Sequence, residues 1–219
     1  MPRITPSAAR QPAAVPQTSG QILDVAERLA QTRGFNGFSY ADIATELGIT
    51  KASLHYHYPT KADLGRALID RYSTTFAAAL AGIEESRAPR PMQLERYVAI
   101  YAEVLKAGRI CLCGMLAAEY TTLPALMQDA IRGFFDVNER WLSLVLESGR
   151  KDGSLAFEGA PEDAARAITS ALEGAMLLAR PYGGAQRFKS AAQRVLKEFA
   201  PATKPPSKKS VTTKTRKRV

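Results

Sequence analysis

Cysteine and histidine are scarce in this sequence, with two of each among 219 residues. Two cysteines are too few for a disulfide scaffold and favour a reducing compartment, so we expect a cytoplasmic protein. No apolar run reaches the roughly 18 residues that a membrane-spanning helix needs, which argues against a membrane protein. The first twenty residues also lack the continuous apolar stretch of a secretory signal.

Acidic residues are absent from both ends of the chain. Residues 1–19 carry a net charge of +2 and residues 201–219 one of +7, whereas residues 20–200 hold 21 basic and 21 acidic side chains. The net charge of +9 therefore belongs to the ends and not to the body. Both ends are rich in Pro, Ser, Thr and Ala, so we predict disordered tails at 1–18 and 201–219. The basic C-terminal tail is expected to add nonspecific attraction for DNA phosphates.

Alternating polar and apolar segments long enough for a sheet are also missing, and helical periodicity replaces them. The pattern predicts an all-α fold of about nine helices, three short ones first and longer ones after. Ser19 is the expected N-cap of the first helix, and Ser39 with Asp42 resembles a capping box for the second. Gly48 would make the next turn, and Thr50 would cap the third helix.

The stretch "GITKASLHYHYPTKADL" has the pattern of the second half of a helix-turn-helix unit. Ile49 and Leu54 would hold the third helix against the first two, which leaves its other face in solvent. That face carries hydroxyl, ammonium, imidazole and phenol groups, and such groups hydrogen-bond base edges and phosphates in a major groove. Thr60 and Lys61 open the next helix, whose backbone amides favour a phosphate.

The segment "ILDVAERLAQTRGFNGFSYADIATELGITKASLHYHYPTKADL" resembles the DNA-binding domain of the TetR/AcrR family of transcriptional regulators. The resemblance implies a helix-turn-helix DNA-binding domain at 19–65 and a helical ligand-binding and dimerisation domain at 66–200. It implies a bacterial homodimer that binds a palindromic double-stranded DNA operator, usually as a repressor released by a small-molecule inducer. Carried over by position, the DNA-contacting residues are Ser39, Thr50, Lys51, Ala52, Ser53, His55, Tyr56, His57 and Lys61. The chain departs from the usual pattern at Ala52 and His55.

The two histidines do not form a metal site. His55 and His57 differ by about 200° around a helix, so they cannot chelate one ion, and no nearby acid or cysteine completes a ligand set. Either they contact DNA or they occupy the helix surface, with His55 turned toward the first helix. We expect no cofactor and no metal. We also expect no enzymatic activity, because the sequence shows no nucleophile–base pair and no phosphate-binding loop.

The second domain shows architecture more clearly than chemistry. Its apolar helices contain aromatic and ionisable residues that either form the core or line a ligand pocket between helices. The pocket that we predict comprises Tyr97, Tyr101, Cys111, Glu119, Phe134, Trp141 and Glu173. The last two long helices, near 161–181 and 184–199, carry small and apolar residues on one face, which suits either a dimeric four-helix bundle or an internal core.

Cys111 and Cys113 lie in "RICLCGMLAAEY". They are either small buried hydrophobic residues or, for Cys111, a reactive thiol whose pKa is lowered by Arg109 and a helix N-terminus. The second reading leads to an alternative function, a regulator that senses electrophiles or oxidants. A further alternative is an all-α small-molecule-binding protein without operator specificity.

Overall fold

The computed structural model describes residues 15–201, and within them the chain forms nine α-helices, two short 3-10 helices and no strand. The first four α-helices are α1 (Val15–Arg33), α2 (Tyr40–Leu47), α3 (Lys51–His57) and α4 (Lys61–Glu85). They are followed by α5 (Arg90–Lys106), α6 (Leu112–Ala118), η1 (Tyr120–Thr122), α7 (Ala125–Asp152), α8 (Pro161–Ala179), η2 (Arg180–Tyr182) and α9 (Ala185–Lys197). The all-α prediction is confirmed. Of the predicted tails at 1–18 and 201–219, residues 1–14 and 202–219 lie outside the described residues. The prediction of disorder is wrong at 15–18, because these residues form the start of α1.

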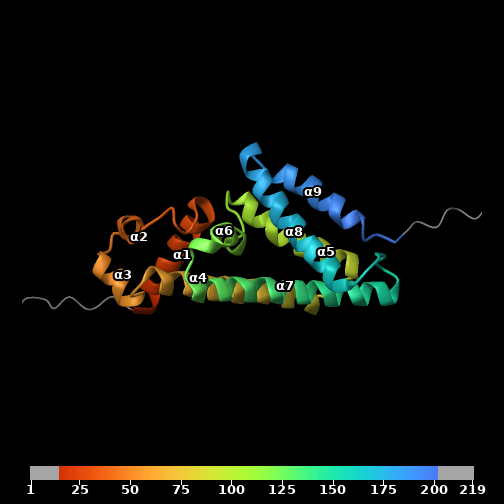
Figure 1. Ribbon diagram of the computed structural model, residues 1–219, viewed down its shortest axis with the longest axis horizontal. Helices are drawn as coiled ribbons and strands as arrows, with labels where there is room; N and C mark the ends of the chain where they lie inside the picture. The colour runs from red at the N-terminus through yellow and green to blue at the C-terminus, as the bar shows by residue number, and fades with distance from the viewer. Residues whose placement is uncertain (1–14, 202–219) are drawn as a thin grey trace, which may run out of the picture.

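The helices form an elongated molecule with two lobes (Figure 1). Helices α1–α3 gather at one end, while α8 and α9 lie toward the other. The two longest helices, α4 and α7, run along the molecule and pack against each other. Helix α4 crosses the boundary that we placed between residues 65 and 66, so both lobes share one rigid element.

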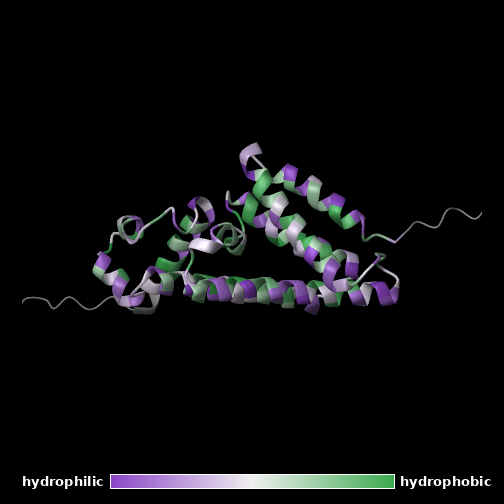
Figure 2. Cartoon of the chain, viewed as in Figure 1, coloured by the Kyte–Doolittle hydropathy of each residue, from purple (hydrophilic) through white to green (hydrophobic). Residues whose placement is uncertain are grey.

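One continuous hydrophobic core runs through both lobes. Along α4, Leu64 and Leu68 are fully buried, and Tyr72, Phe76 and Leu80 continue the same face into the second lobe. Hydrophilic residues mark the visible outer face of α7 (Figure 2), as expected for an amphipathic helix. Because α4 contributes side chains to the core of both lobes, a displacement of this helix would change the packing in both.

The predicted turn and cap residues are confirmed except at the first helix. Gly48 has φ 64°, the left-handed conformation that glycine adopts without strain. The Asp42 carboxylate accepts hydrogen bonds from the Ser39 N–H and hydroxyl, both at 2.7 Å, and Thr50 caps α3. Ser19 is not an N-cap, because α1 begins at Val15; its hydroxyl instead lies 2.9 Å from the Tyr58 hydroxyl.

No helix in the part of the chain that the structure covers is long and apolar enough to cross a membrane.

Candidate functional site

Helix α3 is fixed by one buried side chain and presents most of the others to solvent. Leu54 is its only buried residue, and its exposure is 0%. Lys51 and Ala52 are exposed, and Tyr56 is 75% exposed although it is a large aromatic residue. A phenol held in water on a short anchored helix indicates a surface that binds a partner.

Hydroxyl groups that were predicted to face DNA also stabilise the ends of the helices. Thr50 Oγ1 accepts a hydrogen bond from the Ser53 N–H at 3.2 Å, and Thr60 Oγ1 accepts one from the Asp63 N–H at 3.1 Å. Thr50 and Ser39 remain exposed, and Ser53 is half-buried. The Thr50 and Thr60 hydroxyls therefore fix the starts of α3 and α4, and Ser39 fixes the start of α2 together with Asp42.

The two histidines occupy different surroundings, as their spacing predicts. His55 Nδ1 lies 3.0 Å from the Pro59 carbonyl oxygen, and the His55 ring packs 4.8 Å from the Tyr40 ring. Because a carbonyl oxygen only accepts, the Nδ1–H of His55 is the donor in this contact. The half-buried His57 ring instead packs edge-to-face on Tyr56 at 5.3 Å. His57 and Tyr56 share the outer surface, and His55 lies at its edge.

Lys61 departs from its predicted role. Its ammonium group donates to the Phe35 and Phe38 carbonyl oxygens and lies 4.6 Å and 4.5 Å from the centroids of their rings. Burial lowers the pKa of Lys61, which the nearby Glu119 and Asp42 partly oppose. The ammonium thus holds the loop between α1 and α2 from its inner side, so Lys61 supports the surface around α3 without being part of it.

Tyr40 connects α2 to the segment that follows α3, a role that the sequence did not indicate. Its hydroxyl lies 2.8 Å from the Tyr58 carbonyl oxygen and 2.7 Å from that of Thr60, so α2 is tied to the turn between α3 and α4. Burial, followed by the charge of Asp63, raises the pKa of Tyr40 to about 12. The phenol therefore remains a donor at any physiological pH.

Most of the predicted pocket residues meet inside the second lobe, among α4, α5, α6, α7 and α8. The hydroxyls of Tyr97 and Tyr101 lie 3.0 Å apart, and Trp141 stacks on the Tyr97 ring with centroids 5.7 Å apart. The Phe134 ring contacts Phe76 at 5.2 Å. Three members were missed by sequence reasoning: Tyr72, Cys113 and Thr169. Thr169 lies one helical turn before Glu173, and this spacing could have indicated it.

Glu173 is the ionisable centre of this interior. Its Oε1 atom is buried without a hydrogen-bond partner. Burial raises the pKa of Glu173 to about 7, and the neighbouring Cys111 thiol offsets this only in part. A Cβ atom at Gly114 would lie 2.2 Å from Glu173 Oε2, so the glycine lets α6 pass directly over the carboxyl. We call Glu173, Thr169, Tyr72, Tyr97, Tyr101, Cys111 and Cys113 the acid cluster.

The argument for a low thiol pKa at Cys111 is wrong. Cys111 and Cys113 are 1% and 0% exposed. Burial raises the pKa of both thiols well above the usual value, and the adjacent Glu173 adds to the increase. Arg109 does not contribute to the pKa of Cys111. Both cysteines therefore fit the alternative reading as buried small residues.

Glu119 does not belong to the pocket. Its Oε2 atom accepts a hydrogen bond from the Phe35 N–H at 2.6 Å, and Oε1 accepts one from the Asn36 N–H at 3.3 Å. The Asn36 side chain donates to Thr122 Oγ1 at 2.8 Å, and the Arg180 guanidinium donates to the Thr32 carbonyl. These contacts join the second lobe to the loop that follows α1.

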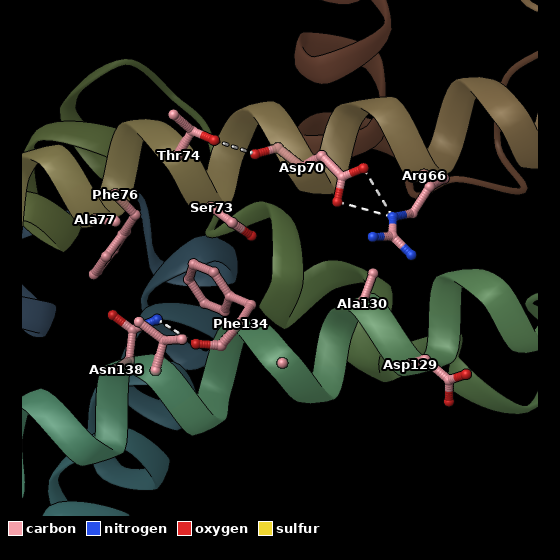
Figure 3. A pocket seen from close by; sticks show the side chains of 12 residues that line it. Arg66, Asp70, Ser73, Thr74, Phe76, Ala77, Asp129, Ala130, Phe134 and Asn138 are labelled. Atoms are coloured by element: carbon pink, nitrogen blue, oxygen red, sulfur yellow. Dashed lines mark hydrogen bonds and ion pairs between the residues drawn. The ribbon is translucent and has the colours of Figure 1, made fainter.

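Two clefts flank the acid cluster. One, of about 460 Å³, lies between α4 and α7, with Phe76 and Phe134 at its floor and the Arg66–Asp70 ion pair on its rim (Figure 3). The other, of about 310 Å³, lies between α1, α4 and α5 and reaches Tyr72 and Phe76. Phe76 lines both clefts, so its ring separates the interior from solvent on two sides. Among the described residues, no group of three or more His, Cys, Asp or Glu is arranged to hold a metal.

Comparison with known proteins places this geometry in a family. Residues 22–68 match the sequence profile of the bacterial regulatory proteins of the tetR family. A TetR-family transcriptional regulator from Agrobacterium tumefaciens is similar at 31% identity and a TM-score of 0.83, over 85% of this chain and 100% of that one. The chain belongs to the TetR family. A TetR regulator from Legionella pneumophila is similar at 34% identity and a TM-score of 0.76, over 83% and 97% of the two chains.

A curated TetR-family relative also covers most of the chain. The HTH-type transcriptional repressor NemR of Escherichia coli is 27% identical over 173 residues, which is 74% of this chain and 84% of that protein. The matched profile spans α1 to the start of α4, the same segment that carries the exposed face of α3. This TetR-family chain is therefore a DNA-binding regulator whose helix-turn-helix is α2 and α3.

Burial of Glu173 predicts a specific pH dependence of stability. Its pKa of about 7 in the folded chain lies above the ordinary 4.5, so between these values the folded chain holds a proton that the unfolded chain releases. The free energy of unfolding should therefore fall as pH rises through this interval, by at most about 3 kcal/mol. Burial raises the pKa of the neighbouring tyrosines and cysteines, so they stay protonated there. Urea unfolding across the interval should show a flatter profile for Glu173→Gln; equal slopes for both proteins would contradict this.

Proposed function

We propose that this TetR-family protein is a homodimeric repressor that binds a palindromic DNA operator through α3 and leaves it when a small molecule enters the second lobe. The observation that carries the proposal is the exposed face of α3, where Lys51, Tyr56 and His57 surround a helix anchored by Leu54. A helix of seven residues reads only a few base pairs, so two copies related by a two-fold axis are needed for a specific site.

The exposed face of α8 supports the dimer. Leu177 and Leu178 are 52% and 56% exposed, and the small residues Ala167 and Ser170 precede them on the exposed side. Small side chains allow two helices to approach closely, and exposed leucines next to them favour burial against a second copy.

Of the two readings of the apolar face of α8, the internal core fits. Ala165, Ile168 and Leu172 are at most 1% exposed within one chain. The dimer contacts that we propose therefore come from the exposed side of α8, at Leu177 and Leu178.

The contacts between the lobes support release by a ligand. Helix α6 starts directly after Cys111 and passes over the Glu173 carboxyl at Gly114. Glu119 follows its last residue and accepts hydrogen bonds from the Phe35 and Asn36 amides of the first lobe. A ligand that moves α6 would therefore also move the loop that precedes α2. Within this proposal the lobes keep the division at 19–65 and 66–200, and no catalytic step is assigned.

Selection of bound duplexes from a random DNA library tests the regulator proposal. We expect the full-length protein to enrich a palindromic motif, and a Tyr56→Ala, His57→Ala double variant to lose the enrichment and bind that motif at least about tenfold more weakly. A matched control is Tyr182→Ala, which removes an equally exposed phenol (69%) far from α3 along the chain. It should bind as the wild type does. Absence of any enriched motif, or the same loss in the control, would contradict the proposal.

A further inference from the structure

Two oxygen atoms on one face of α8 lack partners inside the second lobe. Thr169 is 3% exposed and Glu173 lies one helical turn further on. Among the described residues, neither Thr169 Oγ1 nor Glu173 Oε1 has a hydrogen-bond partner of ordinary geometry, and each has only a weak interaction, Thr169 with the Tyr97 hydroxyl and Glu173 with the Cys111 thiol. Buried polar atoms are nearly always paired because an unpaired one costs free energy. Two such atoms side by side on a helix face indicate a position that a ligand with hydrogen-bond donors would complete.

The ionisable side chains around these atoms are all acids. Tyr72 comes from α4, Tyr97 and Tyr101 from α5, Cys111 from the start of α6 and Cys113 from α6 itself. These side chains and Glu173 influence one another's pKa, and all of them become negative when they lose a proton. Among residues 15–201, no lysine, arginine or histidine contributes to the pKa of Glu173. Within that part of the chain the acid cluster therefore has no cation of its own.

We propose that the acid cluster binds a primary or secondary amine that carries an apolar group. This inference rests on the proposed ligand response and names the chemical class of the ligand. The ammonium would donate to Glu173 and Thr169 and place its charge near the Tyr97 ring, whose electrons attract cations. A neutral alcohol supplies no charge, a carboxylate is repelled, and a quaternary ammonium has no N–H to donate.

The clefts supply the route and the space for the apolar group. Phe76 and Phe134 line the cleft of about 460 Å³ between α4 and α7, and Phe76 also contacts the Tyr97 and Tyr101 rings at 6.0 Å and 5.9 Å. A change of the Phe76 rotamer would connect that cleft to the acid cluster. The amine would then reach Glu173 while its apolar group replaces the Phe76 ring against Phe134.

Amine binding is coupled to a proton. Because Glu173 is largely protonated below its pKa of about 7, an ammonium that binds the carboxylate releases that proton to solvent. Affinity for the ammonium should then fall by about tenfold for each unit that the pH drops below this value. The proton balance is closed: one ammonium enters and one proton leaves.

Titration calorimetry on the full-length protein tests the proposal with benzylamine, benzyl alcohol and benzyltrimethylammonium as probes. We expect benzylamine to bind at least about tenfold more tightly than the other two. Repeating the titration in two buffers of different ionisation enthalpy should show the release of a proton in mildly acidic solution. Glu173→Gln should lose both the preference and the proton release, and Thr169→Val should weaken benzylamine without removing the proton release.

Glu103→Gln is the matched control, because Glu103 is an exposed acid that lines the other cleft. It should bind benzylamine as the wild type does. Loss of binding in this variant would place the amine in the cleft between α1, α4 and α5 and overturn the proposal. Equal affinities for benzylamine and benzyl alcohol would also overturn it. Failure of the amine proposal leaves an enriched operator motif intact, whereas absence of a motif refutes the regulator proposal whether or not benzylamine binds.

Discussion

Replacing Leu54 with alanine is expected to reduce the free energy of unfolding by about 2–5 kcal/mol, the usual cost of truncating a fully buried leucine. The consequence for DNA binding should be larger still. Leu54 is the only buried side chain of α3. The other links of this short helix are weaker surface contacts: its Thr50 cap, the Tyr58 N–H bond of 2.8 Å to the Leu54 carbonyl, and the His55 side chain against Pro59 and Tyr40. Without the anchor, Tyr56 and His57 lose their fixed orientation toward the operator.

Urea unfolding and titration with the selected operator duplex measure the two effects. We expect operator affinity to fall at least about a hundredfold, because every side chain on α3 depends on one position of the helix. Leu126→Ala is the matched control, since this leucine is 48% exposed at the start of α7 and its loss should change the free energy of unfolding by no more than about 0.5 kcal/mol. A Leu54→Ala variant that binds its operator normally would refute the role of the anchor.

The first lobe was predictable because its signals are local. Gly48, Thr50 and the Ser39–Asp42 pair act within a few residues, and the structure confirms each of them. The start of α1 was predicted wrongly for the same reason. Ser19 has the chemistry of a cap, but its hydroxyl meets Tyr58, thirty-nine residues away, and a local rule does not include that contact.

The roles of Lys61 and Glu119 could not be predicted because both depend on the loop between α1 and α2. That loop turns its Phe35 and Phe38 carbonyls toward Lys61 and its Phe35 and Asn36 amides toward Glu119. An acid in an apolar helix was expected to select a ligand, and a lysine after a cap was expected to meet a phosphate. Each side chain instead satisfies backbone groups of a segment far away in the sequence.

The pocket residues were predicted in part because aromatic and ionisable residues on apolar helices mark an interior. The prediction placed Tyr97, Tyr101, Cys111 and Glu173 together, and they do meet. Of the two readings of Cys111, the buried one fits. The reactive-thiol reading judged the influence of Arg109 from sequence distance, whereas full burial raises the pKa of the thiol.

Replacing Glu119 with alanine should weaken the coupling between the unfolding of the two lobes. The Phe35 and Asn36 amides would lose an ionised acceptor, and a charge-assisted hydrogen bond of this kind contributes about 2 kcal/mol to the free energy of unfolding. We expect both amides to exchange their hydrogens faster and the thermal transition to broaden or split, because the first lobe loses a support that α6 provides. Operator affinity should change little, since Leu54 and Tyr40 still fix the recognition surface.

Hydrogen exchange followed by mass spectrometry measures the loop, and calorimetry measures the transition. Glu95→Ala is the matched control, because this exposed glutamate of α5 has no ion pair among the described residues. A rise of about 1.5 Å per residue makes α6 a rod of about 10 Å, with the acid cluster at one end and Glu119 at the other. If Glu119→Ala leaves exchange at Phe35 and Asn36 unchanged, α6 does not link the interior to the loop before α2. Faster exchange confined to that loop would show that Glu119 couples α6 to the segment before α2, alongside the Asn36–Thr122 and Arg180–Thr32 contacts.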